Sequence, residues 1–252
     1  MKKILYFIIA ASALVACQKK QPIITAVNGS LSFTLDVDRE GDYLTKSALP
    51  DVNAFVVDIV RPEDGYLIHF DRLDEIPEVL EIGSGDYTIT ATSAECKAVA
   101  WDQPVYGASA DFTIRVGELT PLSLVATLQN MKVTFRLTER FTKELSNYTV
   151  SVTNATSWEE TVPDVNTLIW DKAAVDGGRP GYFSVAPLMV KVDGYRQDGN
   201  IETHAGLIIS EVAPRDHHII TLDARVTGSV NGISLLIDDS VNEKESDVLV
   251  DG

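Results

Sequence analysis

The segment Leu31-Ser32-Phe33-Thr34-Leu35-Asp36-Val37-Asp38 decides the fold class of this 252-residue chain. Apolar residues occupy every second position of the segment, and polar residues occupy the positions between them. Because successive side chains of a β-strand point to opposite faces, this alternation predicts a strand with one buried and one solvated face. Such strands are typical of antiparallel sheets with one wet face.

The same alternation recurs along most of the chain, whereas helical patterns are scarce. The segment 71–80 is interrupted by Pro77, and the segment 139–145 is long enough for at most two helical turns. Turn signals such as Asp64-Gly65 and Asn231-Gly232 separate the alternating segments. The sequence therefore predicts an all-β protein. The further alternating segments are 55–59, 66–70, 87–91, 112–116, 122–128, 131–137, 148–152, 188–192, 220–226 and 233–237.

The pattern of alternating segments occurs twice along the chain, with an offset of about one hundred residues, although the residues themselves differ between the two copies. A β-sandwich of about 100 residues accommodates about seven strands, so the repeat predicts two tandem antiparallel sandwiches, for which an immunoglobulin-like Greek key is a common arrangement. We expect these domains at 29–128 and 129–252, the second ending in an acidic tail, with a short connection near Gln129-Asn130 that fixes their angle. The corresponding positions are Leu31 and Met131, Phe55 and Tyr148, and Leu122 and Ile220.

The N-terminus has the pattern of an export signal. Two lysines precede an apolar stretch, 4–16, that ends in Leu14-Val15-Ala16-Cys17. This stretch is too short to cross a hydrocarbon core of ~30 Å, which takes about 20 residues. The tetrad resembles the lipobox of bacterial lipoproteins. The resemblance implies that 1–16 is a lipoprotein signal peptide, that Cys17 carries palmitate-type lipid, and that 17–28 is a tether. An ordinary cleaved signal, with Cys17 incidental, is the alternative.

Composition limits the partners of the chain. It has 21 basic and 37 acidic residues, and removing 1–16 takes away two lysines, which leaves a net charge of about −18. Nucleic acid and anionic lipid headgroups repel such a body, so we expect no nucleic-acid partner and a membrane contact only through the N-terminal lipid. With Cys17 acylated, Cys96 has no partner within the chain, so stability must come from burial and not from disulfides.

No catalytic or metal-binding motif is recognisable, so we expect neither enzyme activity nor a cofactor nor a metal. The segment 36–41 begins like a calcium loop, but its twelfth position is Ser47 where a bidentate acid is needed, which favours a solvated strand end. His217 and His218 are neighbours and would point to opposite faces of a strand, so surface histidines are the simpler interpretation.

Several aromatic residues fall outside the alternation. Trp101, Trp158 and Trp170 are candidates for stacking against sugars of a glycan ligand. The alternative is that these rings close the ends of the sandwich cores, because large rings contribute much of the buried area at such positions.

Four segments carry a family resemblance. The segments 85–91 (GDYTITA), 101–107 (WDQPVYG), 112–116 (FTIRV) and 128–133 (LQNMKV) resemble the fimbrillin-like cell-adhesion lipoproteins of Bacteroidales. The resemblance implies a type V pilus-related protein with two transthyretin-like domains, located at the outer membrane. In related pili an arginine-specific protease removes a first strand, and a strand from a neighbouring subunit replaces it.

This resemblance makes Arg39, directly after the segment 30–38, a candidate processing site. The alternative is an arginine in an exposed turn, with a first strand that stays in place. A donor strand could come from 232–238, which reads equally well as the last strand of its own domain. Acidic residues usually follow the lipidated cysteine of surface-exported lipoproteins, but Gln18-Lys19-Lys20-Gln21 follows here, so periplasmic and outward orientations both remain open.

The function predicted from these features is non-catalytic. We expect an outer-membrane lipoprotein that acts in cell adhesion or as a fimbrial component assembled by strand addition. Its partners would be other pilus subunits or a host or cell-surface ligand. A surface glycan-binding lipoprotein is the alternative, based on the tryptophans outside the alternating segments.

Overall fold

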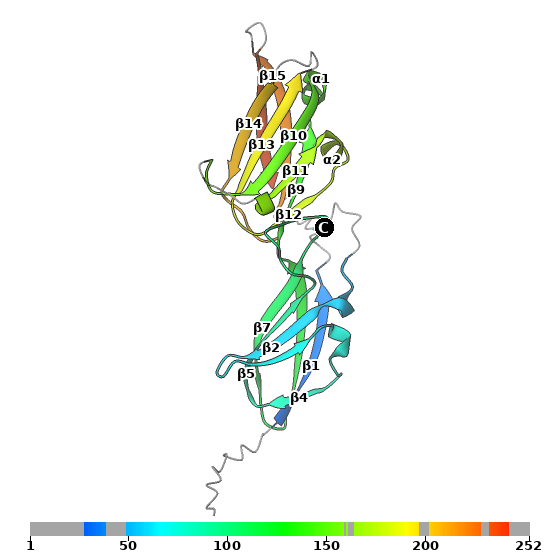
Figure 1. Ribbon diagram of the computed structural model, residues 1–252. Helices are drawn as coiled ribbons and strands as arrows, with labels where there is room; N and C mark the ends of the chain where they lie inside the picture. The colour runs from blue at the N-terminus through cyan, green and yellow to red at the C-terminus, as the bar shows by residue number, and fades with distance from the viewer. Residues whose placement is uncertain are drawn as a thin grey trace, which may run out of the picture.

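A computed structural model describes residues 28–38, 49–158, 160, 164–196, 202–227 and 232–241 of the chain. The described residues form two bodies of β-strands that lie end to end (Figure 1). The few helices are short, and none of those in the described ranges is long and apolar enough to cross a membrane. The prediction of an all-β protein built from sandwiches is confirmed.

The first body is a seven-stranded sheet with the order β3-β2-β5-β7-β8-β1-β4. The sheet folds over on itself, because β7 and β8 pair only at Tyr106–Leu128 and Gly107–Thr127. Its strands are β1 (Asn28–Val37), β2 (Val56–Arg61), β3 (Tyr66–Phe70), β4 (Leu80–Gly83), β5 (Gly85–Thr92), β7 (Tyr106–Ile114) and β8 (Leu119–Leu128), with short 3-10 helices at η1 (Val52–Ala54) and η2 (Leu73–Glu75).

The second body has a four-stranded sheet, β11-β10-β13-β14, and a five-stranded sheet, β16-β15-β9-β12-β6. Its elements are β9 (Met131–Leu137), α1 (Glu139–Glu144), β10 (Leu145–Asn154), η3 (Asp164–Asn166), β11 (Thr167–Asp171), α2 (Lys172–Asp176), β12 (Gly181–Phe183), β13 (Leu188–Arg196), β14 (Glu202–Ile209), β15 (His217–Thr227) and β16 (Gly232–Val241).

The two bodies share one topology. The run β3-β2-β5-β7 matches β11-β10-β13-β14, and β8-β1-β4 matches β15-β9-β12. The pattern repeat in the sequence therefore corresponds to a structural repeat. One detail differs from the purely antiparallel expectation, because β1 runs parallel to β8, and β9 runs parallel to β15. The alternation of side chains is the same in parallel and antiparallel strands, so it does not predict the direction. Two parallel strands must be joined by a long crossover connection, and in each body most of the other strands lie within that connection.

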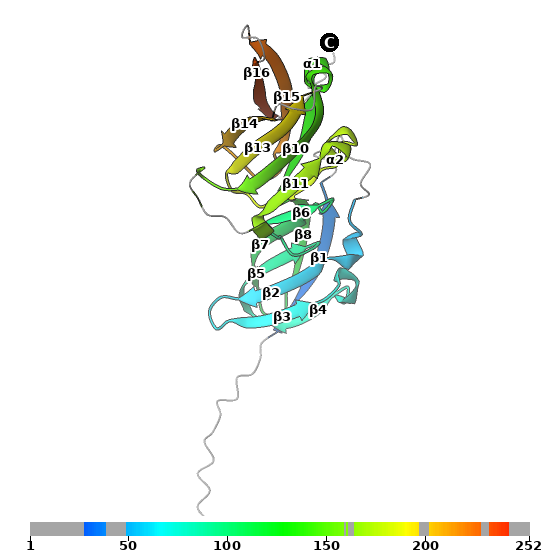
Figure 2. The same cartoon turned by 45° about the horizontal axis from the view of Figure 1, so that its top comes forward.

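The sequence did not predict that one short strand of the first body would join a sheet of the second. The strand β6 (Val99–Trp101) lies in the chain between β5 and β7 of the first body, yet it pairs with β12 of the second. Figure 2 shows it at the junction of the bodies. Val99 and Trp101 pack against the second core, which is why this segment leaves its own body.

Each body has its own hydrophobic core. The first cluster draws on buried residues from Leu31 to Ala126, and the second on residues from Met131 to Ala224. The connection between them is fixed by hydrogen bonds: the Asn130 side chain accepts from the Val105 N–H at 3.1 Å and donates to the Gln103 carbonyl at 3.1 Å. An ion pair between Arg215 and Asp38, 2.5 Å from Nη2 to Oδ2, also joins the bodies.

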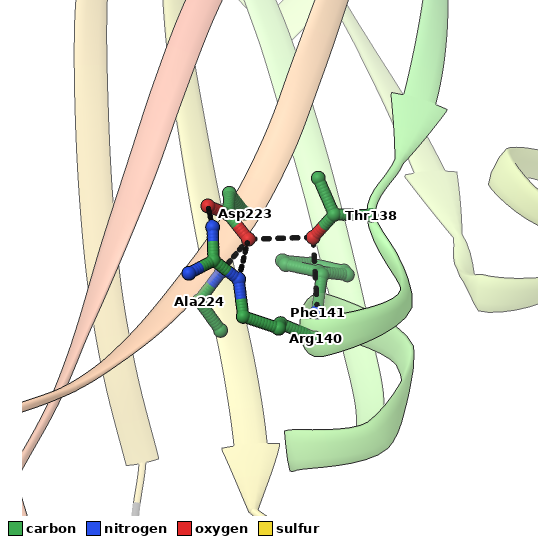
Figure 3. A network of polar contacts seen from close by, with 5 residues as sticks. All are labelled: Thr138, Arg140, Phe141, Asp223 and Ala224. Atoms are coloured by element: carbon green, nitrogen blue, oxygen red, sulfur yellow. Dashed lines mark hydrogen bonds and ion pairs between the residues drawn. The ribbon is translucent and has the colours of Figure 1, made fainter.

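A polar network fastens helix α1 to strand β15 (Figure 3). The Thr138 hydroxyl caps α1 by accepting from the Phe141 N–H at 3.2 Å, and it donates to Asp223 Oδ1 at 2.6 Å. Arg140 forms an ion pair with the same carboxylate. The hydrogen bond from Thr138, with further help from the Ala224 N–H and Arg140, holds the pKa of Asp223 below its ordinary value.

Asp223→Asn is expected to lower the free energy of unfolding by about 1–2 kcal/mol, because it weakens three charge-assisted contacts at a largely buried carboxylate. Since the pKa of Asp223 is depressed, its contribution is present above about pH 4 and is lost as the pH falls below that. Denaturant unfolding at pH 7 and pH 3 measures both effects. Asp74→Asn, in an exposed pair with Arg72, is the control and should cost much less, because solvent screens an exposed ion pair. Equal losses at both pH values would contradict this role of the charge.

Candidate functional site

Two residues singled out in the sequence lie outside the described residues. These are Cys17, the predicted lipidation site, and Arg39, the predicted processing site. The same holds for most of the segment 36–47, which begins like a calcium loop. Its described Asp38 side chain is the ion-pair partner of Arg215. Lipidation and cleavage therefore remain predictions, but the strand that cleavage would release is described.

That strand, β1, is held differently on its two sides. On one side it pairs with β8 over eight positions, from Ser30 to Val37. On the other it pairs with β4 only from Asn28 to Leu31, so the rest of its length has no paired strand on that side within the described ranges. Its Leu31 and Val37 side chains are buried in the first core, with Phe33 and Leu35 packed against it. Removing β1 would therefore leave a groove with apolar walls beside β8.

Two of the three tryptophans proposed to stack on sugars lie in the second core. Trp170 is fully buried, and its indole N–H donates to the Arg179 carbonyl at 2.8 Å. Trp101 of β6 meets it edge to face, with ring centroids 4.6 Å apart. The Arg179 guanidinium lies 4.2 Å from the centroid of the Trp101 ring. Trp170 leaves no face for a ligand, and Trp101 is half-buried beneath Arg179; these two rings close the core.

Trp158 is different, because 47% of its surface is exposed. It follows β10 and lies on the outer side of the β13–β14 hairpin, where it lines an open concavity of about 470 Å³. Lys191, Asp193 and His204 line the same concavity. Of the three tryptophans named as candidates for stacking, Trp158 is the one with a solvent-exposed ring.

The histidines take structural positions. The expectation of surface histidines at the start of β15 is wrong, because His218 is fully buried; His217 is partly buried, and its Nε2 lies 2.8 Å from the Thr134 hydroxyl. Burial, aided by nearby positive charge on Lys132, lowers the pKa of His217 to about 4, so the ring is neutral at pH 7. In the first body His69 lies between Asp58 and Asp71, whose hydrogen bonds raise its pKa. Among the described residues no group of three or more His, Cys, Asp or Glu side chains is placed to hold a metal ion.

The sequence interpretation missed one pair of polar residues. Asp193 Oδ1 and His204 Nδ1 are 2.5 Å apart on neighbouring strands. A signal was present, because the turn signal Asp198-Gly199 stands midway between the two positions. Residues at equal distances from a hairpin turn face each other, so this spacing could have placed Asp193 opposite His204.

The fold defines a protein of two tandem β-sandwich bodies, joined by the strand β6 that the first body contributes to a sheet of the second. The chain belongs to the family described as domain of unknown function DUF4493, which matches residues 28–251. No curated protein matches the chain.

Solved structures of fimbrial proteins are similar to this chain at low identity. A fimbrial assembly protein from Parabacteroides distasonis is 11% identical, with 85% of this chain and 98% of that chain covered and a TM-score of 0.48. The tip fimbrial protein Mfa3 from Porphyromonas gingivalis is 7% identical, with coverages of 84% and 100% and a TM-score of 0.46. The fimbrial anchor protein Mfa2 from the same organism is 11% identical, with coverages of 85% and 98% and a TM-score of 0.42.

Proposed function

We propose that this protein is a non-catalytic outer-membrane lipoprotein that acts in cell adhesion or as a fimbrial component. The proposal combines the lipobox that ends at Cys17 with two sheet-built bodies. The names of the similar fimbrial structures point in the same direction, without carrying the argument. Lipid on Cys17 would tether the bodies to the membrane through the segment 17–28.

The observation that carries the assembly step is the position of β1. This strand lies directly before Arg39 in the chain and fills a groove whose far side is paired over only four residues. Cleavage after Arg39 would release the whole of β1 together with Asp38. An extended segment from a second subunit, with apolar residues at every second position, could then take its place by strand addition.

The source of such a donor segment is a separate question. The segment Gly232–Val241 forms β16, which pairs antiparallel with β15 over ten positions. It thus serves as the last strand of its own body in the single chain. Because β16 stands at the outer edge of its sheet, detaching it would break the pairing to one strand only. We therefore propose that β16 stays paired with β15 in the single chain and detaches to serve as a donor strand only when subunits assemble.

Removal of β1 would also affect the joint between the bodies. The Asp38 carboxylate lies 2.5 Å from the Arg215 guanidinium of the second body and is the residue before the proposed cleavage site. Cleavage would therefore break the ion pair that the first strand contributes to the joint. The pairing of β6 with β12 and the hydrogen bonds of Asn130 would remain.

The processing step can be tested by mass analysis of the protein recovered from cells that produce it. The expected result is an acylated precursor beginning at Cys17 and a mature chain beginning at Glu40. Arg39→Ala should accumulate the precursor and abolish multimers that resist dissociation in detergent. Arg115→Ala, which changes another exposed arginine, is the matched control and should leave both unchanged. A chain that always begins at acylated Cys17, in cells where multimers form, would rule out assembly by removal of β1.

A further inference from the structure

The outer face of the β13–β14 hairpin brings together side chains suited to bind a small ligand. In this hairpin Lys191 is paired with Gly206, and Asp193 is paired with His204. Lys191 and Asp193 are two residues apart on β13, so the two cross-strand pairs are neighbours on one face of the sheet. Together with Trp158 they line the open concavity of about 470 Å³, which is within the usual size of small-molecule sites.

The ring of Trp158 is held in place by its surroundings. A Cβ atom added to Gly206 would lie 2.3 Å from Cη2 of Trp158, so the indole lies directly on the backbone of β14 and needs a glycine there. The turn that carries Trp158 is closed by the Glu160 carboxylate, which accepts from the Thr156 N–H at 2.7 Å and from its hydroxyl at 2.8 Å. The exposed part of the ring is therefore presented by a fixed platform.

Polar groups stand next to this platform. The contact of 2.5 Å between Asp193 Oδ1 and His204 Nδ1 orients the carboxylate and the imidazole, and both side chains remain about half exposed. The Lys191 ammonium lies 5.7 Å from the centroid of the Trp158 ring. A carboxylate, an imidazole and an ammonium group thus line the same concavity as the indole, and hydrogen-bond donors and acceptors are both available.

We propose that this concavity binds a neutral oligosaccharide of pyranose sugars, a ligand class that gives the proposed adhesion function its target and rests on that function. A pyranose ring offers an apolar C–H face that can lie on an indole, and hydroxyl groups around its rim that can bond to Asp193, His204 and Lys191. The net charge of −16 disfavours acidic sugars, because they would approach a strongly negative body.

The strand geometry indicates a ligand of more than one sugar. Tyr195 is on the same face of β13, two residues beyond Asp193, and 43% of its surface is exposed. From Lys191, opposite the glycine that supports Trp158, to Tyr195 the strand rises about 13 Å. This length is comparable to that of a trisaccharide, so Trp158 and Tyr195 would stand at the two ends of the ligand.

An extended peptide fits this surface less well. Peptides commonly bind by adding a strand to an open sheet edge. The edge of this sheet next to the concavity is β14, and β16 of the other sheet lies beside it. The binding groups instead line a concavity on the outer face of the sheet, where a ligand is recognised by stacking and side-chain hydrogen bonds.

The test is binding of the purified chain from residue 18 onward to immobilised neutral trisaccharides, including maltotriose and cellotriose, with 3′-sialyllactose as the acidic comparison. We expect saturable binding to at least one neutral trisaccharide, and an affinity at least ten-fold lower for Trp158→Ala. Gly206→Val should cause a similar loss by displacing the ring, and Asp193→Asn a smaller one. Tyr66→Ala removes a ring of matched exposure, 50%, from β3 of the first body and should bind like the unchanged chain.

Each other outcome overturns the proposal. Absence of binding to every neutral trisaccharide, a preference for the sialylated one, or unchanged binding by both Trp158→Ala and Asp193→Asn would do so. Should Trp158→Ala fail to fold by circular dichroism, Asp193→Asn and His204→Gln decide the question, since both side chains are about half exposed and lie outside the core. The proposed assembly function is measured independently, because the soluble chain needs neither lipid nor cleavage at Arg39 to bind a sugar.

Discussion

Trp170→Ala is expected to lower the free energy of unfolding of the second body by about 3–5 kcal/mol. The Trp170 ring is fully buried and contacts the rings of Trp101, Phe135 and Phe183, so its removal opens a large cavity among aromatic neighbours. It also leaves the Arg179 carbonyl without the 2.8 Å hydrogen bond from the indole N–H.

The same substitution should loosen the joint between the bodies. Trp101 belongs to β6, the strand that the first body contributes, and it packs on Trp170. Urea unfolding followed by near-ultraviolet circular dichroism measures the loss of stability, and limited proteolysis near 99–101 measures the release of β6. Trp158→Ala is the matched control, since its half-exposed ring loses less buried area and should cost clearly less than Trp170→Ala. Equal losses for the two tryptophans would contradict the assignment of Trp170 to the core.

Gly29→Ala is expected to lower the free energy of unfolding by about 2–3 kcal/mol and to unseat the start of β1. A Cβ atom at this position would lie 2.1 Å from the backbone oxygen of Arg115, and a backbone atom cannot move aside as a flexible side chain can. The neighbouring residues are bound to the same turn, through Gly117 N–H to Asn28 O and Ser30 N–H to Glu118 O, both at 2.9 Å. Relief of the clash would therefore break these bonds.

Gly83→Ala is the control for this prediction. Gly83 of the neighbouring strand β4 is paired with Asn28 of β1. A Cβ atom added to Gly83 would meet nothing closer than 3.6 Å. It should change stability by less than about 1 kcal/mol. Thermal unfolding together with hydrogen exchange of the β1 amides distinguishes the two variants. Retention of full protection in β1 of Gly29→Ala would show that the strand is not held at this turn.

Much of the fold could be predicted because alternation reports burial directly. Leu31 and Val37 fall on one face of their segment, and both are buried. The counterpart segment begins at Met131, which is also buried, and the two strands occupy equivalent positions in the two bodies. In both cases the pattern identifies the face that turns inward, because only a period of two places apolar side chains together on a strand.

The candidate site was less predictable. Trp101, Trp158 and Trp170 lie outside the alternating segments identified in the sequence, yet one is fully buried on the inner face of β11, one is half-buried, and one is about half exposed. The difference depends on what each ring meets in space: Trp170 meets three other aromatic rings, whereas Trp158 meets a glycine. These neighbours are distant in the sequence, so no local pattern distinguishes the three tryptophans.

The sequence by itself determined that the chain is built from strands, that its pattern occurs twice, and that the hairpin of β2 and β3 turns at Asp64-Gly65, whereas the similar pair Asp193-Gly194 lies within β13. These properties depend on residues within one strand or one turn of each other. The tertiary structure alone decided that β1 lies parallel to β8, that β6 crosses into the second body, and that Trp158 stands beside Asp193 and His204. They depend on the packing of segments far apart in the chain, since the buried area gained there selects one arrangement among many that satisfy the same alternation.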